Sequence, residues 1–250
     1  MTHEIQLVKL SASAMKTYEQ CPRKYYFNYI ERVPRKHWDH FDLGNICHKS
    51  LEIFHQECMG DRKKDKRTLS QVMGYSFSVA RKDFPNMSDI MLQDAKNMLT
   101  QYLQLMKNNG IPIVKGVETS FNFNIKEDVL IRGFVDRVDL MDDGRYKIVD
   151  YKTTKNEKYL DEFQLLIYGL WLRKNHPDIK SFKGAYILLR HCSKMKEYEF
   201  NMEDVDKIEK KIISYADAIR KEDTWMPIPT GLCNWCDFKN ICPAQKDCTW

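Results

Sequence analysis

The sequence predicts an α/β fold with a helical N-terminal part, a β-rich middle and a cysteine-bearing tail. Three observations support this prediction. Apolar residues recur at helical spacing before residue 110, three short β-rich runs lie between residues 111 and 152, and four of the eight cysteines follow residue 230. With 250 residues, 43% of them hydrophobic and 30% charged, the chain can bury a core as one domain without disulfide bonds.

The first helix is predicted from its cap. Ser11 and Ser13 can each cap a helix that opens near Ala14. The aromatic stretch at 25–30 has the composition of a packed continuation, and Pro22 marks a helix start or a kink between the two. The N-terminal part therefore begins with two helical pieces.

A second helix is expected over 44–59, where apolar residues form a stripe and His48 and Glu52 lie one turn apart. The charged segment 60–68 has few apolar residues and predicts an exposed loop. Two more helices are expected after it, at 69–82 and 88–108.

The middle of the chain has strand composition. Turn residues at 126–128 and 142–144 separate three runs rich in β-branched and aromatic residues, at 113–125, 129–141 and 145–152. This order predicts a three-stranded meander. Further elements are expected in the order helix, two paired strands and helix, at 160–175, 182–190, 196–201 and 202–220.

Composition and charge exclude some classes of protein. No apolar run approaches the ~20 residues that a membrane span needs, and the N-terminus lacks the features of a secretory signal. We therefore expect an intracellular, cytoplasmic location. The net charge of +5 permits an anionic partner without identifying one.

The triplet Asp150-Tyr151-Lys152 is the first candidate for a reactive site. Asp-x-Lys occurs five times in the sequence, so the pattern alone is weak, but only this copy ends a predicted apolar strand. Strand alternation puts Asp150 and Lys152 on one face. Asp136 lies on the preceding strand, and a hairpin can bring it close to Asp150. Two converging carboxylates suit Mg²⁺ or Mn²⁺.

This combination of residues is suited to phosphodiester hydrolysis. A bound metal polarises a phosphate oxygen and generates hydroxide, and Lys152 can stabilise the charge that grows on phosphorus. Two simpler interpretations remain open. Asp136 can form a plain ion pair with Arg137 or Lys152, and Lys152 can be a strand-end lysine that extends to solvent.

Four motifs in order resemble the RecB-family exonucleases, a branch of the PD-(D/E)XK superfamily that includes AddB and the CRISPR-associated RecB-like nucleases. The motifs are Gly44-x-x-x-His48, Gly133-x-x-Asp136, Asp150-x-Lys152 and Gln164-x-x-x-Tyr168. The resemblance implies a restriction-endonuclease-like core, in which helices flank a central mixed sheet.

The resemblance also implies roles for individual residues. Four metal ligands are implied, namely the side chains of His48, Asp136 and Asp150 and the main-chain carbonyl of Tyr151. Lys152 would be catalytic together with Asp136 and Asp150, and Gln164 and Tyr168 would position the substrate backbone. Glu118 is expected to contact and orient the metal ligands without binding the metal itself. Taken singly, His48 can also be an ordinary helix histidine, and Tyr168 a half-buried core residue.

The tail contains Cys233, Cys236 and Cys242 in a C-x₂-C-x₅-C run. The resemblance implies that Cys21, which stands in a Cys-Pro-Arg context, is the fourth ligand, with Cys248 as its competitor. Four thiolates can hold Zn²⁺ or a [4Fe-4S] cluster, and the family favours the structural iron-sulfur cluster. The other cysteines are expected to be buried thiols, at 47, 58 and 192.

Residues 1–250 are thus expected to form a single nuclease domain. Its parts are a helical segment carrying His48, a nuclease core and a cluster-binding tail closing onto Cys21, at 44–110, 111–201 and 225–248. The predicted function is a DNA exonuclease acting on single-stranded or unwound ends in recombination, repair or replication, directed by a helicase, recombinase or CRISPR integration partner.

Three alternatives compete with this function. They are a non-catalytic module that binds DNA ends or a partner, a CRISPR spacer-processing nuclease, and a sequence-specific restriction endonuclease. The intact set of His48, Asp136, Asp150 and Lys152 argues against the non-catalytic module. The cysteine cluster, and the lack of a recognisable specificity domain, argue against the restriction enzyme.

Overall fold

The structure, a computed structural model, describes residues 7–35, 39–59, 66–155, 157 and 160–247. The chain divides into two compact units. The central unit comprises Trp38–Phe121 and Phe134–Asp206, and the terminal unit comprises Met1–His37, Asn122–Gly133 and Lys207–Trp250.

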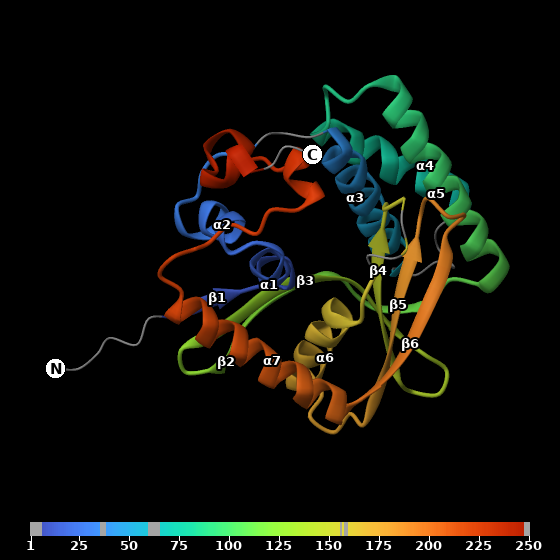
Figure 1. The fold of residues 1–250 in the computed structure, drawn as a ribbon. Coiled ribbons are helices and arrows are strands. Elements are labelled where there is room, and N and C mark those ends of the chain that lie inside the picture. The colour runs from blue at the N-terminus through green and yellow to red at the C-terminus, as the bar shows by residue number, and fades with distance from the viewer. Residues whose placement is uncertain (1–6, 36–38, 60–65, 156, 158–159, 248–250) are drawn as a thin grey trace. The chain divides into compact units, whose positions relative to one another are not determined.

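A mixed sheet organises the central unit (Figure 1). Its strands are β2 (Ile113–Lys126), β3 (Val129–Leu140), β4 (Tyr146–Lys152), β5 (Ser181–Leu188) and β6 (Lys194–Asn201). Strand β3 pairs with β2 and runs antiparallel to β4, β4 runs parallel to β5, and β5 runs antiparallel to β6. The expected meander and the expected mixed sheet are both confirmed.

Helices cover both faces of this sheet. They are α3 (Asp39–Met59), α4 (Leu69–Ala80), α5 (Asp89–Asn109) and α6 (Phe163–Asn175), with the short 3₁₀ turn η2 (Arg81–Asp83) after α4. Strand alternation turns Val149, Tyr151, Ala185 and Ile187 toward the core formed with α3, α4 and α5. Helix α6 packs on the opposite face, where Leu165 approaches Gly184 (Figure 1).

Local signals explain where these helices begin and end. Thr68 and Gln71 form a reciprocal capping box at the start of α4, and Ser88 caps α5. Gly110 follows the last residue of α5 with a φ of 82°, which a glycine adopts without strain. The position of α6 depends on Gly169, because a Cβ there would lie 2.5 Å from the Phe182 ring.

The terminal unit contains β1 (Val8–Leu10), α1 (Ala12–Gln20), α2 (Pro22–Tyr25), the π-helical η1 (Tyr26–Ile30), most of α7 (Met202–Lys221), and the 3₁₀ turns η4 (Gly231–Trp235), η5 (Lys239–Ile241) and η6 (Pro243–Asp247). Strand β1 runs parallel to the first residues of β3. Ser11, not Ser13, caps α1, and Pro22 is the first residue of α2, as expected of a helix start.

Aromatic packing attaches the tail to α1 and α2. The Trp225 ring stacks on Tyr25 with 5.8 Å between ring centroids and 7° between planes. Glu222 accepts hydrogen bonds from the main-chain N–H of Thr224 and Trp225 at 3.1 and 2.9 Å, and from the Tyr18 hydroxyl at 3.3 Å. These contacts hold Trp225 at a φ of 49°, which is uncommon for a residue other than glycine.

Several boundaries differ from the sequence prediction. Helix α3 begins at Asp39 and not at residue 44, and α6 begins at Phe163 and not at residue 160. Strand β1 was not predicted, because three residues are too few to show an alternation. The expected loop at 60–68 falls mostly outside the described residues. Within the described part of the chain, no helix is long and apolar enough to cross a membrane.

Candidate metal centre and cysteine cavity

The residues predicted to be catalytic gather in one cavity of the central unit. Helix α3 carries His48, β3 carries Asp136, β4 carries Asp150 and Lys152, and α6 carries Gln164. All five line a single cavity of about 1100 Å³. Tyr151 also lines it, and Tyr168 lies within hydrogen-bond distance of Asp150. The structure therefore brings the four sequence motifs together.

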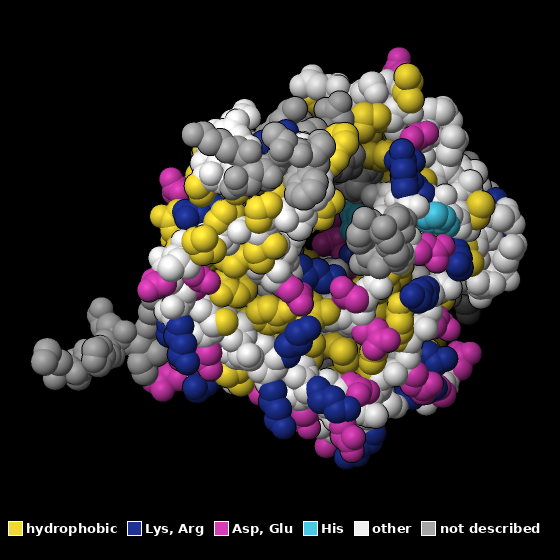
Figure 2. All heavy atoms as spheres, viewed as in Figure 1, with side chains coloured by type: hydrophobic (Ala, Val, Ile, Leu, Met, Phe, Trp, Pro, Cys, Tyr) yellow, Lys and Arg dark blue, Asp and Glu magenta, His cyan; other side chains and the backbone are white. Residues whose placement is uncertain are grey.

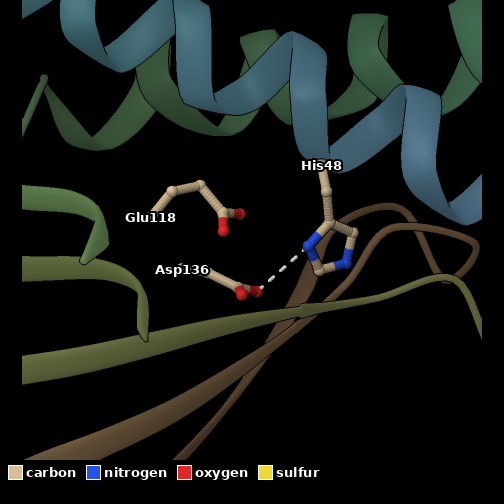
Figure 3. A group of neighbouring side chains, drawn as sticks. All are labelled: His48, Glu118 and Asp136. Carbon is tan, nitrogen blue, oxygen red and sulfur yellow. Dashed lines mark ion pairs between the residues drawn. The ribbon is translucent and has the colours of Figure 1, made fainter. Parts of the chain in front are cut away.

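A three-residue group with metal-ligand chemistry lies at the centre of this cavity. One ligand atom each of His48, Glu118 and Asp136 lie within 4.8 Å of one another. His48 Nδ1 is 3.3 Å from Asp136 Oδ2, and Figure 3 shows both carboxylates extending from the strands toward the imidazole below helix α3. Nitrogen and carboxylate oxygen donors at such spacing fit Mg²⁺ or Mn²⁺.

Glu118 has a different place from the one expected. We predicted that it would orient the metal ligands without binding the metal itself, but its carboxylate reaches the same point as the His48 and Asp136 ligand atoms. Its backbone has a φ of 44° inside strand β2, in the left-handed region that residues with a Cβ rarely adopt. Backbone strain of this kind costs on the order of 1–3 kcal/mol and often marks a functional position.

Asp150 and Lys152 form the second half of the site. Lys152 Nζ lies 2.7 Å from Asp150 Oδ2 and donates a hydrogen bond to Gln164 Oε1 at 2.9 Å. Tyr168 donates its hydroxyl proton to Asp150 Oδ1 at 3.3 Å and accepts a hydrogen bond from the Gln164 amide. Tyr168 is thus both a buried core residue and a member of the site.

Neither simple interpretation of the charges describes the geometry. Asp136 does not pair with its neighbour Arg137, whose guanidinium binds Asp139, and Lys152 pairs with Asp150. Asp136 instead accepts a hydrogen bond from the main-chain N–H of Tyr151 at 2.8 Å. Lys152 lines the cavity, where Asp150 and Gln164 hold its amino group although 28% of its side chain is exposed.

Burial and crowded charges shift the pKa values of this group. Burial lowers the pKa of His48, but the charge and hydrogen bond of Asp136 outweigh it and raise the pKa to about 9. Burial and the nearby Asp136 raise the pKa of Glu118 to about 7. Burial also raises the pKa of Asp150, although Lys152 opposes the shift. A bound cation would relieve this repulsion between carboxylates.

The cysteines predicted as ligands line one cavity of the terminal unit: Cys21, Cys233, Cys236 and Cys242. Cys21 stands at the non-helical junction between α1 and α2, and the others lie in or beside the tail's 3₁₀ turns. The main-chain N–H groups of Ile228 and Thr230 point at the sulfurs of Cys21 and Cys233, at 3.5 and 3.3 Å.

The remaining cysteines have different environments. Cys47 and Cys58 are buried, as expected. Cys192 is exposed in the turn between β5 and β6, so the prediction of a buried thiol there is wrong. This tight turn has positive φ at both Cys192 and Ser193, and it buries Ser193 while it leaves Cys192 exposed. Cys248 lies outside the described residues.

Comparisons with known proteins bear on the family and the fold of this chain. The profile of the PD-(D/E)XK nuclease superfamily matches residues 9–243. The chain is 27% identical over 217 residues to an ATP-dependent helicase/deoxyribonuclease subunit of Streptococcus mutans serotype c, and 26% identical over 196 residues to one from Streptococcus pyogenes serotype M12. These matches cover 81% and 72% of this chain, but only 20% and 18% of the relatives.

A solved structure supports the fold. The crystal structure of a candidate exonuclease from Eubacterium rectale aligns with a TM-score of 0.55 and 14% identity, over 91% of this chain and 86% of that one. At this identity the likeness extends to the fold and no further. The resemblance to RecB-like nucleases that the motifs predicted is confirmed by the profile and by the two Streptococcus relatives.

Proposed function

This chain belongs to the PD-(D/E)XK nuclease superfamily, and we propose that it is a metal-dependent DNA exonuclease acting on single-stranded or unwound ends. One observation carries the proposal: His48, Asp136, Asp150 and Lys152, from one helix and two strands, line the same cavity. A module that only binds DNA ends has no need of this combination of metal ligands and a lysine paired with a buried carboxylate.

Each residue of the site would have its own role in the reaction. His48, Asp136, Asp150 and the main-chain carbonyl of Tyr151 would hold Mg²⁺ or Mn²⁺, and Glu118 is placed to join them. The cation, when bound, supplies positive charge that polarises the scissile phosphate and lowers the pKa of water. Lys152 would stabilise the negative charge that develops on the phosphate oxygens, while Gln164 and Tyr168 orient Lys152 and Asp150.

Nucleic-acid binding is supported by the walls of the same cavity. They include the cationic side chains of Lys49, Lys155 and Arg190 and the aromatic rings of Phe41 and Phe84. Cations hold phosphates and aromatic rings stack on unpaired bases, a combination suited to single strands. Elsewhere, Figure 2 shows acidic and basic side chains interspersed on the visible face, so the cavity, more than a general basic surface, supports the proposal.

For the cysteine cavity we propose a [4Fe-4S] cluster, with Zn²⁺ as the alternative. The family resemblance favours the cluster, and the four sulfurs that would hold either group line one cavity. The two N–H groups directed at sulfur suit either group.

A helicase or recombinase partner is part of the proposal. The relatives from Streptococcus are named as subunits of ATP-dependent helicase/deoxyribonucleases, and this chain spans about a fifth of their length. An enzyme that degrades unwound ends needs a supply of unwound DNA. No observation favours a CRISPR integration partner or a spacer-processing role.

The test uses end-labelled linear and circular DNA, single- and double-stranded, with Mg²⁺, Mn²⁺ or EDTA. We expect linear single strands to be degraded only with metal, and the Asp150→Ala and Lys152→Ala variants to be inactive. Asp178→Ala and Lys180→Ala are matched controls, because they alter another Asp-x-Lys triplet that lies outside the cavity. Full activity in either site variant would refute the site, and equal loss of circular DNA would show an endonuclease.

A further inference from the structure

Arg137 is a buried cation that the proposed chemistry does not use. It directly follows Asp136 on β3, and only 2% of its surface is exposed. Because alternate residues of a strand point to opposite faces, its guanidinium lies on the far side of the strand from the Asp136 carboxylate. A charge buried in this way is costly unless several groups satisfy it.

The terminal nitrogens of the guanidinium have several hydrogen-bond partners. One of them donates to Asp139 Oδ2 at 2.9 Å, while Nε lies 2.9 Å from Asp139 Oδ1 as an ion pair without hydrogen-bond geometry. The other terminal nitrogen reaches the Tyr151 hydroxyl at 2.8 Å, His55 Nε2 at 2.9 Å and the Tyr102 hydroxyl. A planar guanidinium presents its donors at fixed angles, so these partners define one orientation of the group.

The partners come from the elements that carry the proposed metal ligands. His55 lies on α3 two turns after His48, a spacing that returns to the same side of the helix. Tyr151 lies on β4 between Asp150 and Lys152, and its main-chain N–H donates to Asp136 at 2.8 Å. Arg137 therefore connects α3, β3 and β4 in the layer between the sheet and helices α3 and α5.

We infer that Arg137 is a positioning residue, which sets the spacing of the metal ligands through Tyr151 and His55 without touching metal or substrate. When the hydroxyl of a tyrosine is held by a hydrogen bond, the main chain of that tyrosine has less freedom to change direction. That main chain carries the N–H bound to Asp136 and the carbonyl proposed as a ligand. Changes to groups that support metal ligands commonly weaken metal binding by about 10- to 100-fold. The inference rests on the proposed metal-dependent function.

The test measures Mn²⁺ binding without DNA, by electron paramagnetic resonance of the free ion, together with the Mn²⁺ concentration that gives half-maximal nuclease activity. Tyr151→Phe removes one hydroxyl and keeps the main chain, and Arg137→Lys keeps the charge and removes the planar group. We expect Tyr151→Phe to weaken Mn²⁺ binding about 10-fold and Arg137→Lys to weaken it by up to about 100-fold, with half-maximal activity shifted equally.

Two controls separate positioning from general loss of stability. Arg132→Lys makes the same exchange at an exposed position of β3 and should bind Mn²⁺ as the wild type does. Val72→Ala removes core volume from α4 and should lower the melting temperature without changing Mn²⁺ affinity. If Arg137→Lys does not fold, the Mn²⁺ affinity of Tyr151→Phe alone tests the positioning role.

The possible failures are distinguishable. Wild-type Mn²⁺ affinity in folded Tyr151→Phe and Arg137→Lys would overturn the positioning role and leave the proposed nuclease intact. A wild-type protein that binds no Mn²⁺ and cuts no DNA would overturn the proposed function, and the positioning role with it.

Discussion

The two cavities hold their predicted ligands by different means. In the central unit, His48 lies in a helix of 21 residues, and Asp136 and Asp150 lie in strands of 12 and 7 residues. In the terminal unit, Cys21 occupies a break between helices, and the tail cysteines lie in or beside 3₁₀ turns of 3 to 5 residues. Long hydrogen-bonded elements fix side chains without help from a ligand, whereas short turns do not.

Because of this difference, we expect the carboxylate site to determine activity and the cysteine cavity to determine stability. The carboxylate site is built in advance, so removal of the proposed cation should abolish the proposed activity and leave the fold intact. The cysteine cavity joins residues far apart in the sequence, so the loss of the proposed metal group should chiefly reduce stability. Substitutions in each cavity can test this contrast.

The largest effect is expected at Asp150. Asp150→Asn keeps the side-chain volume but removes the charge that would hold the cation, so nuclease activity should fall about 1,000-fold or more. The melting temperature should stay the same or rise, since a buried charge close to Asp136 is lost. Initial rates on labelled single-stranded DNA measure this, with Asp178→Asn as control. An active, correctly folded variant would contradict the site.

The second effect is on stability. Cys21→Ser or Cys242→Ser should remove visible absorbance and bound iron, because either change breaks the four-sulfur set. Closing a loop of more than two hundred residues contributes ~5 kcal/mol, which corresponds to a fall of about 10 °C or more in melting temperature. Iron and zinc analysis after oxygen-free purification, with Cys192→Ser as control, measures it. A colourless, zinc-containing wild type would refute the iron-sulfur proposal.

Glu118 tests how far the carboxylate site extends. Glu118→Gln keeps the shape and removes one charge from the group with His48 and Asp136. Mn²⁺ affinity, measured by calorimetry, should fall about 10-fold. Glu52→Gln alters another acid that lines the cavity and should change the affinity less. Equal effects of the two changes would show that Glu118 acts only through general charge.

The smallest effect is the pH dependence of the metal-free protein. His48 has a folded pKa of about 9, so its stabilising contribution is complete below its ordinary value of 6.5 and is lost as pH rises through 9. Glu118, with a pKa of about 7, contributes below its ordinary 4.5 and loses that contribution through 7. Between pH 5 and 9 both contributions fall as pH rises.

We therefore expect the metal-free melting temperature to drop over that range, while Mn²⁺ binding strengthens because it requires both groups deprotonated. Thermal scans at pH 6 and 8.5, with and without Mn²⁺, measure the two trends. The double variant with His48→Gln and Glu118→Gln should lose this part of the pH dependence. If the stability of the metal-free wild type rises over this pH range, and by as much as that of the double variant, then His48 and Glu118 do not cause the pH dependence.

Local pattern was enough to predict most of the fold and the site. The alternation in β4 placed Asp150 and Lys152 on one face, and the turn at 142–144 made β3 and β4 a hairpin that brings Asp136 close. These relations are set within about twenty residues. The resemblance to the RecB-family exonucleases then implied that His48, Gln164 and Tyr168 belong to the same site, and each of them contacts Asp136, Lys152 or Asp150.

What sequence reasoning missed depends on packing between distant segments. Arg137 was considered as a partner for its neighbour Asp136, yet strand alternation turns the two apart. Its partners His55 and Tyr102 become neighbours only when α3 and α5 pack on the sheet. The role of Glu118 was underestimated because the direction of its side chain depends on a positive φ, which the residue type does not predict. The alternation rule alone could have corrected the first error.

The position of Cys21 has a consequence for biosynthesis. More than two hundred residues separate it from Cys242, so at about 5–20 residues per second a ribosome needs roughly 10–40 seconds between the two. During that interval the four-cysteine cavity cannot exist, although the helices, strands and carboxylates of the central unit have already been made up to β6 and can fold. Completion of the cavity is therefore a late step of maturation, and the proposed metal group requires Cys21 to stay reduced and unmodified until the tail emerges.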